Sequence, residues 1–245
     1  MPESPTIADL FTDVALISYE HQMHMIEVIG DSDHEWDAKF DAPPRLVFTT
    51  PDREIVSPRF HLLGSAAPGP ESWLWSWANP TGYPAEITAL AEGVRQFGEQ
   101  HQIPELADGE VMFKQFPDEP TESIRVAWLV GELAKAVSGQ YTLYLGNAAG
   151  GTRIAMLVEH PEFVLPAPTG ASVLRVIQEG LMNLGLPDHW RVLRGYMARR
   201  GLSATFAGDR ELMLVRGPGI NMTVLFDDIG RVARIQSTLE PGDPA

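Results

Sequence analysis

The chain has 245 residues, 44% of them hydrophobic and 21% charged, which is typical of a globular protein and excludes a disordered or fibrous one. It contains no cysteine, so disulfides, thiolate metal sites and cysteine nucleophiles are excluded, and a reducing compartment is favoured. The formal net charge of −15 predicts a surface that repels nucleic acids and anionic membranes and tolerates a basic protein partner or a cationic ligand.

The charge distribution indicates how the chain is divided into units, and the N-terminus indicates where in the cell the protein is found. Residues 1–165 hold 9 basic and 25 acidic side chains, whereas residues 166–245 hold 9 and 8, and this asymmetry predicts two units with different surfaces. The acidic N-terminus lacks the basic start and apolar stretch of a signal peptide, and the sequence has no run of about 18 uncharged apolar residues. We therefore predict a cytoplasmic protein without a membrane span.

The N-terminal part of the chain predicts one helix followed by a small sheet. Ser4 is a good N-cap and Pro5 a good first helical residue, and an apolar row continues the helix to about Gly30. Short proline-containing turns separate the next strand-like segments, which favours an antiparallel meander, and Pro58 indicates an edge or a bulge. These segments cover residues 34–41, 45–50, 54–63 and 72–79.

Three of the six tryptophans, Trp73, Trp75 and Trp77, occupy alternate positions just before Asn79. Alternate residues of a strand share a face, so the three indoles are predicted to stand together. Burying about 150–250 Å² of each indole at about 25 cal/mol per Å² gains on the order of 4–6 kcal/mol, which favours core packing over exposure. The functional alternative is a ligand groove beside the indoles that includes Asn79, although the Asn-Pro-Thr-Gly run starting there favours a turn.

The segment from Phe60 to Ser65, followed by the W-L-W-S-W-A-N run of residues 73–79, resembles a bacterial family known only as a domain of unknown function. The resemblance covers roughly residues 5–160, with a leading helix, a short sheet that ends in W-x-W-x-W-A-N, and further helices. It implies a fold of this kind and no activity. Residues 166–245 lie outside it.

The middle of the chain predicts two helices and a hairpin. One helix starts at Pro84, and a second runs from Thr121 to Ser138 and Gly139. The hairpin joins residues 141–145 and 153–159 around a glycine-rich loop. Because this loop lacks both the lysine and the following helix of a phosphate-binding loop, we interpret it as a turn rather than as a nucleotide site.

The C-terminal part predicts a second unit behind a proline-rich linker. The predicted domains are residues 1–160 and 170–240, and residues 161–169 link them. Two helices at about 170–184 and 187–200 precede four antiparallel strands that end at Leu239. The predicted fold class is therefore α+β, with two units that each pack helices on an antiparallel meander sheet.

Histidines are the candidate metal ligands. His21 and His24 stand three residues apart on the first predicted helix, a spacing that presents two imidazoles to one ion. They also continue the apolar row of that helix, which favours half-buried histidines held by hydrogen bonds. No third ligand is evident, so we predict neither a metal nor a cofactor. His61 alternates with apolar neighbours and is predicted to face away from their core.

Four arginines are interleaved with two aromatic residues in one predicted helix: Arg191, Arg194, Arg199 and Arg200, with Trp190 and Tyr196. Such interleaving can bind nucleic acid, but Arg199 and Arg200 also suit a helix C-terminus just before Gly201. Given the overall charge, we predict no nucleic acid partner, and the role of the arginines stays open.

The motif content of the sequence bears on the class of function. The sequence has neither the G-x-S-x-G nor the H-E-x-x-H motif, which favours a binding protein over an enzyme. The first hypothesis is a non-catalytic protein-binding module, an immunity-type inhibitor or a chaperone-like protein, whose acidic unit covers a basic partner. The alternative is a small-molecule-binding protein or hydrolase with a pocket beside the tryptophans, and a third is a homodimer. The candidate binding residues are Trp73, Trp75, Trp77, Asn79 and His61.

Overall fold

The computed structural model describes residues 4–31, 34–208 and 210–239. The first three residues of the predicted N-terminal domain and Glu240 at the end of the second lie outside these ranges. The described residues form six α-helices and twelve strands in three antiparallel sheets, which confirms the α+β class. None of these helices has the length and apolar character that a membrane crossing requires.

By their contacts, the residues group into two compact units. The first comprises Met1–Leu10 and His21–Val164, and the second comprises Phe11–Glu20 and Leu165–Ala245. Helix α1 (Ile7–Ile29) contributes residues to both. The division into domains 1–160 and 170–240 with a linker at 161–169 stays a prediction, since it concerns independent folding.

Helix α1 ends where the sequence predicts and begins two residues later. Its C-cap is Gly30, at φ +82°. Its N-cap is Thr6 rather than Ser4, because Thr6 has an acidic residue three positions on: Thr6 Oγ1 accepts from the Asp9 N–H at 3.1 Å, and Asp9 Oδ2 accepts from the Thr6 N–H at 3.0 Å.

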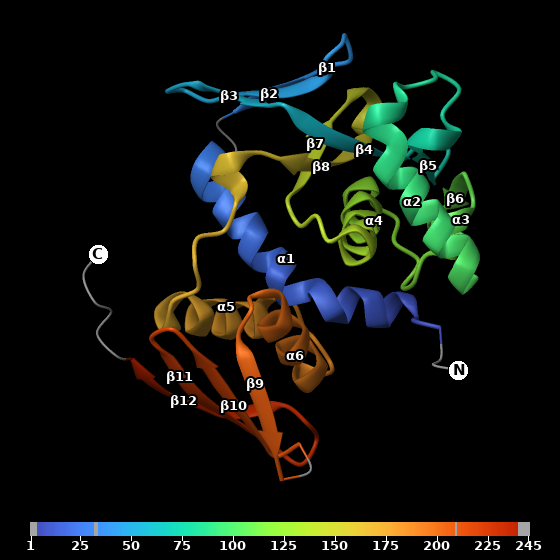
Figure 1. The fold of residues 1–245 in the computed structure, drawn as a ribbon. Coiled ribbons are helices and arrows are strands. Elements are labelled where there is room, and N and C mark those ends of the chain that lie inside the picture. Colours follow the sequence, from blue (N-terminus) through green and yellow to red (C-terminus); the bar gives the residue numbers. More distant parts are fainter. Residues whose placement is uncertain (1–3, 32–33, 209, 240–245) are drawn as a thin grey trace. The chain divides into compact units, whose positions relative to one another are not determined.

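The first unit contains a three-stranded sheet in the order β1-β2-β3 and a five-stranded sheet in the order β6-β5-β4-β8-β7 (Figure 1). The chain breaks at Pro58 between β3 and β4, so the predicted third strand is two strands in different sheets. The strands are β1 Glu35–Lys39, β2 Arg45–Thr49, β3 Glu54–Ser57, β4 Arg59–Ala67, β5 Ser72–Trp75, β6 Glu110–Met112, β7 Leu143–Asn147 and β8 Arg153–Glu159. The helices are α2 Ala85–His101, α3 Pro104–Ala107 and α4 Ser123–Ser138.

Both faces of the five-stranded sheet are buried. One face packs against α2 and α4, and we call this the helix-side core; Leu63, Trp73 and Leu157 belong to it. The other face packs against β2 and β3, and we call this the sheet-side core; Leu62 and Met156 belong to it. Figure 1 shows the same three layers, with β1–β3 over one face of β4 and β8 and the helices over the other.

The second unit packs two helices on one face of a four-stranded meander (Figure 1). Its elements are α5 Gly170–Asn183, α6 His189–Arg199, β9 Ser203–Ala207, β10 Leu212–Gly217, β11 Ile220–Phe226 and β12 Val232–Leu239. Alternate residues of β10 and β11, such as Met213 and Val224, are buried, whereas their neighbours are not. This period of two places the apolar face of the sheet against the helices.

Two glycines of α2 provide a matched test of packing. A Cβ at Gly93 meets no atom within 4 Å, whereas a Cβ at Gly98 would lie 2.6 Å from Leu106 Cβ and 2.9 Å from the Ala107 nitrogen. We expect Gly93→Ala to raise the free energy of unfolding by about 0.5–1 kcal/mol and Gly98→Ala to lower it by about 1–3 kcal/mol. Urea denaturation of the two variants measures both, and equal effects would contradict the close approach of α2 and α3.

Candidate functional site

The tryptophan run is divided between a strand and a turn. Strand β5 ends at Trp75, and Ser76–Ala78 form a 3₁₀ turn, so Trp77 does not continue the strand as expected. Trp73 and Trp75 are completely buried in the helix-side core with their rings at 86°. The Trp75 Nε1–H donates to the Glu105 carbonyl at 3.2 Å. Both indoles therefore pack in the core, the arrangement that the burial energy favoured.

Polar side chains fix the turn that follows. The Ser76 hydroxyl donates to the Leu62 carbonyl at 2.5 Å, and Asn79 Oδ1 accepts from the Thr81 N–H at 3.0 Å. The second bond is the turn interaction that the Asn-Pro-Thr-Gly run predicts. It occupies the amide oxygen of Asn79, and Asn79 Nδ2 donates no hydrogen bond to the described residues.

A cavity of about 360 Å³ lies in the first unit, between β1 and the sheet-side face of the five-stranded sheet. We call it the inter-sheet cavity. Two residues of the tryptophan run, Ser76 and Asn79, reach it. Its lining residues are Trp36, Asp37, Ala38, Phe40, Leu62, Gly64, Ser65, Ser76, Asn79, Tyr83, Thr152, Ile154 and Met156.

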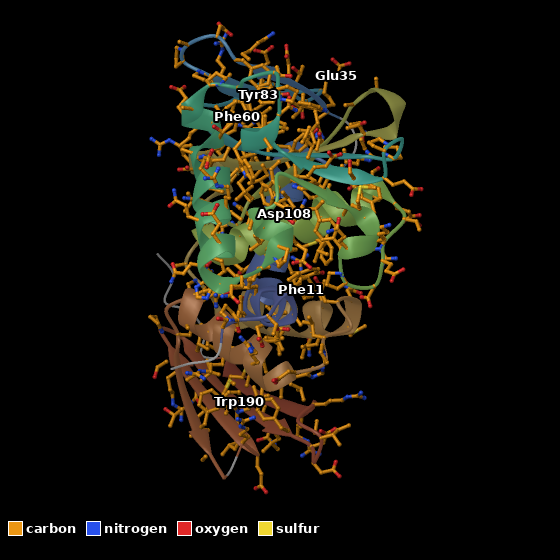
Figure 2. All side chains as sticks on the ribbon, turned by 90° about the vertical axis from the view of Figure 1, so that its right-hand side faces the viewer. Phe11, Glu35, Phe60, Tyr83, Asp108 and Trp190 are labelled. Carbon is orange, nitrogen blue, oxygen red and sulfur yellow. The ribbon has the colours of Figure 1, made fainter. Side chains whose placement is uncertain are left out.

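Three aromatic rings wall this cavity. Trp36 lies directly over Gly146 of β7, where a Cβ would come within 2.5 Å of the indole. Phe40 packs against Tyr83 with the ring centroids 5.4 Å apart and against Phe60 at 6.2 Å. Figure 2 labels Tyr83 and Phe60, the two rings that Phe40 contacts. Phe40 is 42% exposed, so it lies at an open side of the cavity.

The polar groups of the cavity that have no partner among the described residues are neutral. Ser65 and Thr152 make no side-chain hydrogen bond to any described residue, so their hydroxyls are available to a ligand, as is Asn79 Nδ2. The carboxylate of Asp37 pairs with Lys39. The lining residues include no lysine, arginine or histidine. The arrangement therefore offers apolar contact, ring stacking and neutral hydrogen bonds.

The remaining candidate residues lie elsewhere in the first unit. Trp77 is half-buried under the Arg95 guanidinium, 4.9 Å from the ring centroid. His61 does stand on the face opposite Phe60 and Leu62, but that face is buried too: its side chain is 14% exposed, and its Nε2 lies 2.7 Å from Glu159 Oε1. The structure thus places neither His61 nor the three indoles on the lining of the inter-sheet cavity.

His21 and His24 are held by separate partners. His21 Nδ1 lies 3.3 Å from the Thr142 hydroxyl, and His24 Nε2 lies 2.9 Å from the Glu162 carbonyl. Within the described ranges, no three histidine, aspartate or glutamate side chains converge as a metal-binding group would. Hydrogen bonds of this kind are what the apolar row of the helix predicted.

The arginine-rich helix α6 is engaged within the second unit. Arg191 forms a two-point ion pair with Asp13 of α1, with N–O distances of 2.5 and 2.8 Å. Arg200 pairs with Glu20, which also accepts from the Tyr196 hydroxyl at 3.0 Å. Arg194 lies over the Trp190 ring, which Figure 2 labels. Acidic residues far away in the sequence therefore neutralise two of the four arginines, a pairing that sequence spacing does not reveal.

A family of unknown function (DUF6882) matches residues 8–161. The chain belongs to this family. The resemblance over residues 5–160 is thereby confirmed, and the match runs from α1 to the end of β8. No curated protein and no solved structure matches the chain.

The contact between Trp36 and Gly146 generates a test of the cavity wall. Gly146→Ala forces the indole to move, so we expect a changed near-ultraviolet circular dichroism spectrum and a loss of about 1–3 kcal/mol in unfolding free energy. Gly69→Ala is the control, because a Cβ there meets no atom within 4 Å. Wild-type spectra and stability for Gly146→Ala would contradict this placement of Trp36.

Proposed function

We propose that the protein binds a small, ring-bearing apolar molecule in the inter-sheet cavity. The observation that carries this proposal is the combination of three aromatic walls, Trp36, Phe40 and Tyr83, with free neutral hydrogen-bonding groups in one concave space. Ligand pockets are typically apolar and aromatic spaces of about 300–1,000 Å³ with a few placed polar groups. Burying roughly 200 Å² of apolar ligand surface gains on the order of 5 kcal/mol before the cost of association.

Binding rather than catalysis fits the groups available in the cavity. Its one carboxylate, Asp37, is paired with Lys39, and Ser65 and Thr152 have no histidine or lysine beside them in the lining to act as a base. The pocket that the sequence analysis expected beside the tryptophans is accordingly proposed on the opposite face of the same sheet. Ser76 and Asn79 belong to the tryptophan run and also line the inter-sheet cavity.

The test uses the full chain and N-phenyl-1-naphthylamine, an uncharged fluorophore that joins a naphthalene to a phenyl ring. We expect its fluorescence to rise on binding and the tryptophan emission of the protein to fall, because Trp36 lines the cavity. Ser65→Leu fills the cavity from β4 and is expected to weaken binding at least tenfold. Ser203→Leu, on an exposed position of β9, is the matched control and should bind as the wild type does. Equal binding by wild type and Ser65→Leu would exclude this cavity as the site.

A second candidate is binding of a basic protein partner, as an immunity-type inhibitor or chaperone-like protein in the bacterial cytoplasm. The observation that favours it is the net charge of −16 over residues 1–165. A charge of this size attracts a basic surface and accelerates its association at low ionic strength.

The partner hypothesis predicts a salt-sensitive complex. We expect the tagged full-length chain, captured from its own cells at low salt, to retain one basic protein near stoichiometry, as read by mass spectrometry. The same capture at 0.5 M NaCl should lose it, because salt screens exposed charges. If the tagged chain retained no protein at low salt, this candidate would be excluded. If it retained only a second copy of itself, the result would indicate the homodimer instead.

A further inference from the structure

Strand β7 forms one edge of the five-stranded sheet and pairs only with β8 among the described strands. The register shows which backbone groups face away from β8. The Val158 N–H donates to the Thr142 carbonyl, and the Ala148 N–H donates to the Thr152 carbonyl. Hydrogen-bonded positions alternate in an antiparallel pair, so residues 143, 145 and 147 direct their N–H and C=O groups outward.

This outward row opens into a groove of about 550 Å³, which shares one lining residue, Trp36, with the inter-sheet cavity. We call it the edge groove. Leu143, Leu145 and Asn147 all line it, and within the described chain their outward groups have no hydrogen-bond partner. The other lining residues come from the end of α1, from β1 and the segment before it, from α4 and from β7: Gln22, Met25, Ile26, Ile29, Gly30, Asp31, His34, Trp36, Ile124, Trp128 and Tyr144.

The walls of the edge groove are apolar and its charge is negative. Ile124 and Trp128 of α4 are 38% and 39% exposed, so both present apolar surface to the groove. Burial lowers the pKa of His34, so this imidazole is neutral at pH 7. Burial also raises the pKa of Tyr144, the partner of His34, to about 12. Asp31 is therefore the charged group among the lining residues that the structure describes.

We propose that an extended segment of a basic partner protein binds in the edge groove as an added strand beside β7. Its backbone would hydrogen-bond to residues 143, 145 and 147, its apolar side chains would contact Ile124 and Trp128, and its basic residues would face Asp31. This inference rests on the second candidate function and is independent of the inter-sheet cavity. A partner is favoured over a second copy because two chains of net charge −15 repel each other.

The experiment uses a nine-residue peptide of alternating lysine and valine. The readout is hydrogen–deuterium exchange at the amides of Leu143, Leu145 and Asn147 in the full chain. We expect at least tenfold slower exchange at these amides when the peptide is bound. The same peptide with every backbone nitrogen methylated keeps its charge, but it cannot donate hydrogen bonds and its methyl groups prevent the close approach that lets its carbonyls accept from β7. It should therefore give no protection. A glutamate–valine peptide tests the charge requirement and should also fail.

Two variants distinguish strand addition at β7 from non-specific attraction of a basic peptide to the acidic protein. Ile124→Lys changes an exposed rim residue and should weaken peptide binding at least tenfold without changing the fold. Leu145→Pro removes one outward N–H while the β7–β8 hydrogen bonds stay, and it should abolish protection at the neighbouring amides. Both should still bind N-phenyl-1-naphthylamine, so a failure of the edge groove is distinguishable from a failure of the cavity. The proposal would be overturned if the methylated peptide protected these amides as well as the unmethylated one does. It would also be overturned if a higher concentration of the protein without peptide protected them and formed a dimer.

Discussion

The burial of both faces of the five-stranded sheet is the constraint on which the first unit depends. A sheet in this position must supply apolar side chains in both directions, whereas an exposed sheet needs only one apolar face. Trp73, Trp75 and Leu157 supply the helix side, and Leu62 and Met156 supply the sheet side. Both candidate binding surfaces follow from this layering, since the cavity lies above one face and the groove follows the sheet's edge.

Strand β4 carries a bulge at the crowded centre of the five-stranded sheet. Leu62 pairs with Met156 and Gly64 pairs with Ala155, so Leu63 is an extra residue. Leu62 and Leu63 face different cores, as adjacent residues of a strand do, and the extra residue shifts the alternation that follows them. Gly64 has no room for a side chain, because a Cβ would lie 2.2 Å from the Leu74 carbonyl oxygen and 2.7 Å from the Trp73 ring. The buried tryptophans thus help to shape the strand that borders the inter-sheet cavity.

Local sequence signals predicted where helices and strands lie better than they predicted which strands pair with one another. Gly30, Pro84 and Gly139 mark helix ends or starts as expected, and the four C-terminal strands form the predicted meander. The strand expected over residues 72–79 was too long, because Ser76 bonds to the Leu62 carbonyl and turns the chain. The order of the first unit's strands was not predictable, since β8 inserts beside β4 from about 90 residues away.

By itself, the sequence determined the α+β class, the burial of Trp73 and Trp75 and the turn at Asn79, because each depends on local period, turn chemistry or apolar area. The family was indicated by a resemblance over residues 5–160. Only the tertiary structure decided the candidate sites. No sequence spacing relates the cavity residues Trp36, Tyr83 and Thr152. They line one cavity only because two sheets stack in the folded chain. The free edge of β7 likewise depends on which strand pairs with β8, and pairing between distant segments is set by global packing rather than by local sequence.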